Sequence, residues 1–401
     1  MSGEIPAESN EERDYSLVLE LVAERTYDIK FISVLRLVNR KVAALSGRAV
    51  NELKIFWNYD EVVINDVCLQ HSTSKEKDVT RLLDLVKSGF EWIFNLGSNT
   101  SNIQSVEFRC NTDSEGTLPF FSSLLFLVTD LVSQLPVNKG IKKLIWLVDR
   151  GDMNAYIMGN LLEECRQTLE CVILHGSSLF LKNCDRFWKA LGECRSVKEF
   201  ACSLPKDHWS VWESLADALR WKPLRTLRID KLPTEQMVHI LSCPAVRKSL
   251  HSLELYESPD TDNSLNWAQL SASLSRFHPP VSLKRVKELS LDLGSYPGVE
   301  CGWNWNCIYS IFPKVEIISL KSAPDLVWLS EFCQLFFNTF NENRTLLLLA
   351  NIKPKYAHRG LLQTVDSVTV KHVQLIKTKS GNIKKATFLN GSVTIKIECT
   401  L

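Results

Sequence analysis

Apolar residues recur along most of this chain in the order apolar-x-x-apolar-x-apolar. The phrase occurs eight times, and successive copies begin 26 to 38 residues apart. Side chains two apart on a strand point to the same side, so the last two apolar residues of each copy predict a short strand with one buried face. The copies are Ile103/Val106/Phe108, Ile141/Leu144/Trp146, Leu169/Val172/Leu174, Val197/Phe200/Cys202, Leu224/Leu227/Ile229, Leu250/Leu253/Leu255, Val286/Leu289/Leu291 and Val315/Ile318/Leu320.

Between the copies, apolar residues recur at three-and-four spacing, which predicts helices with one apolar face. These helices are expected at 152–166, 181–194, 209–221, 234–241 and 264–276. Repeated alternation of strand and helix predicts an α/β solenoid, a horseshoe with parallel strands inside and helices outside. A doubly wound globular sheet is the alternative, although its strands would not repeat one phrase so regularly.

The repeat length is close to that of leucine-rich repeats, and the chain resembles that family over residues 48–364. An irregular first copy, Val50/Leu53/Ile55, fits this boundary, because terminal repeats have one face that meets water instead of a neighbour. From Val365 onward the apolar residues alternate with polar ones. Turn signals at Ser380-Gly381-Asn382 and Asn390-Gly391 divide this stretch, so residues 365–401 predict a C-terminal cap of three antiparallel strands.

Residues 15–47 predict three short helices, with Asp28 placed to cap the second of them. A unit of about thirty residues cannot bury enough apolar surface to be stable alone, since folded domains below about 40 residues need outside support. We therefore expect this module to pack against the repeats or to bind another protein. The preceding residues 1–14 are polar and acidic, and are expected to be a disordered lead.

The apolar and basic positions of residues 15–47 resemble an F-box, with matches at Leu17, Val18, Leu21, Val22, Ile32, Leu35, Leu37, Val38, Arg40 and Lys41. F-box modules placed before leucine-rich repeats are a known family arrangement. The resemblance implies a non-catalytic substrate receptor of a cullin-RING (SCF-type) ubiquitin ligase, with the repeats holding a target protein. It also implies that the cullin-linker protein contacts Leu17, Val18, Leu21, Ile32, Leu35, Leu37 and Val38. The alternative is that residues 15–47 only cap the first repeat of an interaction scaffold with no ligase role.

In a horseshoe, the residues that flank the apolar pair of each strand project from the concave face and are candidate contacts for the target. They include Glu107 and, as the preferred candidates, Arg109, Arg228, Asp230, Glu254, Tyr256 and Asp292. Tyr and Arg contribute strongly to binding at interfaces, which favours Tyr256 and Arg228. Asp230, Glu254, Glu288 and Asp292 are expected close in register, and an acidic patch would favour a basic peptide. The alternative is an ordinary solvated face.

The composition adds few constraints, with 401 residues, 45% hydrophobic residues, a formal net charge of +1 and a pI near 7.5. A near-neutral balance predicts no nucleic-acid partner and no membrane partner, although local patches remain possible. The beginning of the chain lacks the basic and apolar regions of a signal peptide, and the apolar stretch 120–128 is too short to span a membrane. We therefore expect a cytoplasmic or nuclear protein that is not secreted, with its twelve cysteines reduced.

Catalytic motifs are missing from the sequence, which contains no GxGxxG, no phosphate-binding GxxxxGK[ST], no HExxH and no GxSxG. Cys194, Cys202 and His208 lie close in sequence but lack the paired spacing of a structural zinc site. Buried thiols explain these cysteines better. We therefore expect no catalytic residue, no metal site and no cofactor.

Overall fold

The chain divides into two compact units, Met1–Cys194 and Arg195–Leu401. The computed structural model describes residues 52–57, 61–64, 67–71, 104–110, 140–148, 155–175, 185–203, 209–230, 233–256, 267–292, 305–320, 336–339, 344–350, 372–377, 383–390 and 393–399. None of the helices in these ranges is long and apolar enough to cross a lipid bilayer.

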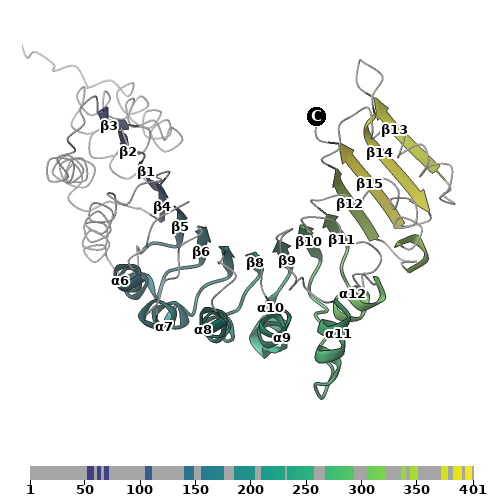
Figure 1. Cartoon of the computed structure of the whole chain (residues 1–401), viewed down its shortest axis with the longest axis horizontal. Coiled ribbons are helices and arrows are strands. Elements are labelled where there is room, and N and C mark those ends of the chain that lie inside the picture. The colour runs from purple at the N-terminus through teal and green to yellow at the C-terminus, as the bar shows by residue number, and fades with distance from the viewer. Residues whose placement is uncertain are drawn as a thin grey trace, which may run out of the picture. The chain divides into compact units, whose positions relative to one another are not determined.

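The first unit contains a sheet with the order β3-β2-β1-β4-β5-β6. Its strands are β1 (Glu52–Trp57), β2 (Glu61–Ile64), β3 (Val67–His71), β4 (Ser105–Cys110), β5 (Lys143–Val148) and β6 (Cys171–His175). β1, β4, β5 and β6 run parallel, whereas β2 and β3 pair antiparallel on the outer side of β1. Helices α6 (Ala155–Cys165) and α7 (Asp185–Glu193) pack against each other beside this sheet (Figure 1).

The second unit contains a sheet with the order β7-β8-β9-β10-β11-β12-β15-β14-β13. Its strands are β7 (Glu199–Ser203), β8 (Thr226–Asp230), β9 (Ser252–Tyr256), β10 (Glu288–Asp292), β11 (Ile317–Leu320), β12 (Arg344–Ala350), β13 (His372–Lys377), β14 (Ile383–Asn390) and β15 (Val393–Cys399). The pairs from β7 to β12, and the pair β12–β15, are parallel. β15, β14 and β13 follow as an antiparallel group.

Five helices lie along one side of the second sheet (Figure 1): α8 (Trp209–Leu219), α9 (Thr234–Ser242), α10 (Pro244–Ser249), α11 (Trp267–Ser275) and α12 (Trp305–Ile311). α8 packs on α9, α9 on α11, and α11 on α12. The architecture is therefore α/β, with parallel strands on one side and helices on the other, an arrangement compatible with a solenoid.

The apolar positions of the repeated phrase form the core. Leu227 pairs in register with Leu253, Leu253 with Leu289, and Leu289 with Ile318, and the second apolar residue of each strand follows the same rule. These four side chains are all at most 1% exposed. The residue that begins each copy is buried too, as at Leu224. Each strand therefore adds one layer to a continuous apolar stack, which no single repeat could bury alone.

The helices form for the reasons that their sequences suggest. α7 buries Phe187, Trp188, Ala190 and Leu191, which lie on one face at helical spacing, and it begins with Asp185, whose negative charge is favourable near a helix N-terminus. α10 has a proline in its first turn, where the missing N–H has no partner to lose.

The five helices predicted between copies of the phrase are all present, within a few residues of the expected bounds. The three C-terminal strands are antiparallel, as the turn signals predicted, with Asn390 opposite Val393 across the predicted Asn-Gly turn. The sequence did not predict β12, α10 or α12, nor that β15 would pair with β12. Residues 1–51, which include the F-box-like module and the lead, lie outside the described residues.

Candidate functional site

The face of the second sheet that points away from the helices is the candidate interaction surface. Along β8 the burial alternates, with Leu227 and Ile229 buried toward the helices and Arg228 exposed between them. Glu254 lies half-buried at the equivalent position of β9. Parallel sheets usually have both faces covered. A partly exposed face on such a sheet can accept another molecule.

Strand register brings most of the predicted contact residues together. Arg228 on β8 is opposite Glu254 on β9, and Asp230 is opposite Tyr256. Tyr256 in turn is opposite Asp292 on β10. Of the four acidic residues expected close in register, Asp230, Glu254 and Asp292 lie at or next to these paired positions, and Glu288 is opposite Ser252 at the other end of β10. Arg228 lies among them, so the row of residues carries charge of both signs.

Asp230 also acts on the core beneath it. Burial raises the pKa of the Cys202 thiol well above its usual range, and the negative charge of Asp230 raises that pKa further. Cys202 is 2% exposed on β7, and it pairs with Ile229, the residue before Asp230. The carboxylate therefore helps to keep this thiol protonated.

Arg109, the remaining preferred candidate contact, lies on β4 in the first unit, apart from the five candidates of the second unit. Its side chain is 59% exposed and forms an ion pair and a hydrogen bond with Glu107 two residues earlier. Glu107 itself is only 7% exposed, so little of its carboxylate is available to a partner. The Arg109 guanidinium covers the Glu107 carboxylate, because a buried charge needs a partner.

The residues expected to contact the cullin-linker protein are Leu17, Val18, Leu21, Ile32, Leu35, Leu37 and Val38, and all of them lie outside the described residues. Within the described ranges, no group of three or more His, Cys, Asp or Glu side chains could hold a metal ion.

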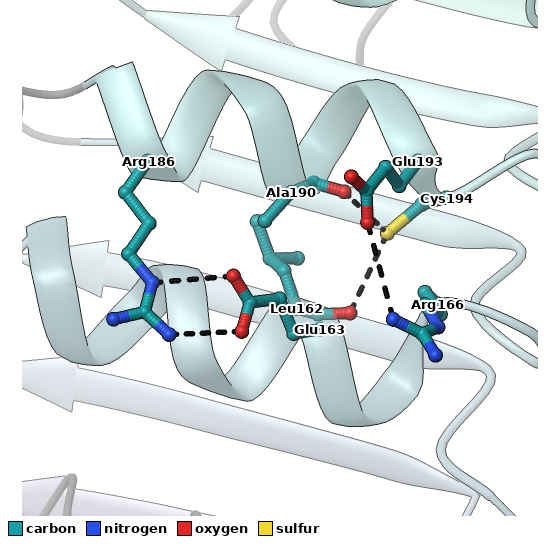
Figure 2. Close-up of polar contacts among 7 residues, drawn as sticks. All are labelled: Leu162, Glu163, Arg166, Arg186, Ala190, Glu193 and Cys194. Carbon is teal, nitrogen blue, oxygen red and sulfur yellow. Dashed lines mark hydrogen bonds and ion pairs between the residues drawn. The ribbon is translucent and has the colours of Figure 1, made fainter.

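Cys194 and Cys202 are buried thiols, as predicted. Cys194 is fully buried after α7, and its thiol donates weak hydrogen bonds to the carbonyl oxygens of Ala190 at 3.3 Å and Leu162 at 3.6 Å (Figure 2). Cys202 is equally inaccessible on β7. Among the described residues these two thiols pack in the core and are not presented to a ligand.

One set of residues, three of them exposed and one half-buried, escaped the sequence analysis. A basic residue or histidine directly precedes each of the strands β7 to β10: Lys198, Arg225, His251 and Lys287. Backbone hydrogen bonds link these four residues in order, from Arg225 N to Lys198 O, from His251 N to Arg225 O and from Lys287 N to His251 O. The signal was present in the sequence, one residue after the start of each apolar phrase, but it has meaning only once the copies are stacked.

Comparisons with known proteins add no assignment, since no family model and no curated protein matches the chain.

Proposed function

We propose that this chain is a non-catalytic substrate receptor of an SCF-type ubiquitin ligase, in which residues 15–47 bind the cullin-linker protein and a leucine-rich-repeat solenoid binds a target protein. The observation that carries the proposal is the in-register stacking of the apolar phrase in strands β7 to β11, with the described helices α8 to α12 on one side of the sheet. Repeat stacks of this kind typically serve as extended binding surfaces.

The target would lie on the helix-free face. Arg228, which is exposed on β8, and Glu254, its neighbour on β9, offer charge of both signs within one strand spacing of about 4.8 Å. Tyr256 and Asp292 occupy the next positions by strand register. Charged and aromatic residues in one patch favour a specific protein partner, because charge complementarity excludes wrong partners while arginine and tyrosine supply binding energy.

The ligase role depends on residues 15–47 and the target-binding role on the repeats, so each is tested separately. The full chain is mixed with purified cullin-linker protein and the complex is isolated by affinity purification. We expect the wild-type chain to retain the linker and the variant Leu35→Asp/Leu37→Asp to lose it, because two carboxylates disrupt an apolar contact. Circular dichroism checks that the variant remains folded.

Arg228→Glu is the matched control, since it reverses a charge on the helix-free face and leaves residues 15–47 intact. We expect this variant to keep the linker. If the wild-type chain does not retain the linker, residues 15–47 are not an F-box, and the protein is a repeat scaffold with no ligase role.

A further inference from the structure

In the second unit, basic residues recur in the segments that lead from a helix into the next strand. The formal net charge of the whole chain, +1, gives no sign of this local concentration of positive charge. Lys198, Arg225 and Lys287 directly precede β7, β8 and β10, and His251 holds the same position before β9. Backbone hydrogen bonds of 2.6 to 2.8 Å join these four residues in order, one on each layer. A second row lies three residues earlier in the chain. We name the two rows together the basic edge, formed by Arg195, Lys198, Arg225, Lys248, Lys284 and Lys287.

Most of the basic edge is accessible. Lys198 is half-buried, and the other five residues are exposed. The equivalent of Arg195 and Lys248 in the β8 repeat is Lys222, which is 1% exposed and therefore does not belong to the edge. Its neighbour Trp221 is 69% exposed instead.

Several of these cations are not neutralised within the protein. In the described ranges, Arg195, Arg225, Lys248 and Lys284 form no salt bridge, whereas Lys287 pairs with Glu316. The position of one of these cations is explained by a helix dipole, because Lys248 lies in the last turn of α10, where positive charge is favourable. α8 and α11 have no basic residue in their last turns, so the remaining cations have no such explanation.

Exposed aromatic side chains accompany the cations. Trp221 follows α8, with the Arg220 guanidinium 4.8 Å from its ring centroid, and Phe277 follows α11 and is 41% exposed. Both lie in the segment between a helix end and the next strand, which is also where every residue of the basic edge except Lys248 lies. The edge therefore combines positive charge with apolar contact area.

We infer that the basic edge binds an acidic segment of the target protein, one that carries an apolar residue among its carboxylates. The inference rests on the target-binding role proposed above but not on the ligase role. Four strands at a spacing of about 4.8 Å give the edge a length of about 15 Å, which matches about five extended residues. The exposed Glu199 and Glu288 directly follow Lys198 and Lys287. A nucleic acid, which carries a phosphate on every nucleotide, would be repelled by these glutamates, whereas a peptide can place its carboxylates away from them.

Fluorescence anisotropy of a labelled Glu-rich peptide of about eight residues with one central Trp tests the inference on the full chain. We expect binding that weakens as salt is added, because exposed charges are screened. The triple variant Arg225→Glu/Lys248→Glu/Lys284→Glu should bind at least about tenfold more weakly. The control Lys142→Glu reverses a residue in the equivalent place before β5, next to Gln104 and Glu170, and should bind as wild type does.

Failure of the wild-type chain to bind the Glu-rich peptide at low salt overturns the inference, and so does equal binding by the folded triple variant. Tighter binding of a labelled oligothymidylate than of the peptide would also overturn it, because the edge would then be a nucleic-acid site. None of these three results bears on the cullin-linker assay, which probes residues 15–47, so this inference and the ligase role fail independently.

Discussion

Arg186 donates two hydrogen bonds to the carboxylate of Glu163, from Nε at 3.2 Å and from Nη2 at 2.9 Å, and so joins α7 to α6 (Figure 2). Beside this pair, Arg166 of the α6 end lies 4.0 Å from Glu193 of α7 (Figure 2). In one pair the arginine comes from α7 and the glutamate from α6, and in the other pair the arginine comes from the α6 end and the glutamate from α7. All four side chains are at least 35% exposed.

Glu163→Gln should destabilise the first unit modestly. The Arg186 hydrogen bond lowers the pKa of Glu163 below its ordinary value of 4.5, so the ionised form is stabilised in the folded state. Because the side chains are partly exposed, we expect a loss of only about 0.5 to 1 kcal/mol near neutral pH. Hydrogen exchange of the backbone amides in α6 and α7 measures this loss.

The same pair predicts a pH dependence. A lowered folded-state pKa contributes stability above the unfolded-state pKa, and this contribution is lost as the pH falls through the folded-state pKa. The difference in amide protection between wild type and Glu163→Gln should therefore be full near pH 7 and disappear as the pH falls below 4.5. A difference that persists at lower pH would show that the substitution acts through packing.

Gly140→Ala should destabilise the contact between the segments before β5 and β6. A Cβ at residue 140 would lie 2.5 Å from Thr168 Oγ1, whose hydroxyl donates a 2.8 Å hydrogen bond to Ile141 O. The added methyl group displaces this hydroxyl, at an expected cost of about 1 to 3 kcal/mol. Chemical denaturation followed by circular dichroism measures the change.

Thr168→Ala in the same background gives the control. This substitution removes both Oγ1 and Cγ2, which would lie 2.5 Å and 3.0 Å from the added methyl group, and leaves residue 168 Cβ at 3.2 Å, a tight but adjustable contact. The double variant should therefore lose less stability than the sum of the single variants. Strict additivity would mean that the Thr168 side chain beyond Cβ is not the obstacle.

Leu227→Ala should destabilise the second unit by about 2 to 5 kcal/mol, because its side chain is fully buried in the aligned stack and the cavity cannot be filled by its neighbours. Arg228→Ala, one residue later on the exposed face, should change stability by no more than about 0.5 kcal/mol. Urea denaturation of both variants gives the comparison. Similar losses would contradict the assignment of the two faces of β8.

Alkylation by iodoacetamide should distinguish the thiols. Cys202 and Cys194 are buried, and burial raises the pKa of Cys202, so little reactive thiolate is present at pH 8. Cys307, half-buried on α12, should react first. Mass spectrometry of peptides from the native protein gives the order of reaction, and unfolding in guanidinium should make all three equally reactive.

Sequence reasoning succeeded where a side chain is placed by local periodicity. The spacing of Leu224, Leu227 and Ile229 over six residues predicts a bend followed by a strand, and all three side chains are fully buried. It failed at β12, where Leu346–Ala350 form a continuous apolar run without alternation and Asn343 stands where other copies begin with an apolar residue. It also missed α10, because six residues are too few to show a helical period.

Only part of the candidate site could be predicted from the sequence. Alternation placed Arg228 on the open face, but it could not reveal that Glu107 would be buried beneath Arg109, since that depends on the packing of β4 and β5. The basic edge needs register as well. Lys198 and Arg225 are 27 residues apart in sequence, and only the stacking of layers makes them neighbours.

The order of strands at the end of the second sheet has a consequence for synthesis on the ribosome. β15 is translated after β13 and β14, yet it is the strand that pairs with β12, over seven residues from Arg344↔Val393 to Ala350↔Cys399. Until residues 393–399 have left the exit tunnel, the nascent chain cannot close this side of β12, and an unpaired strand edge invites association with other chains. β12 therefore keeps an unpaired edge for as long as residues 393–399 are not available to cover it.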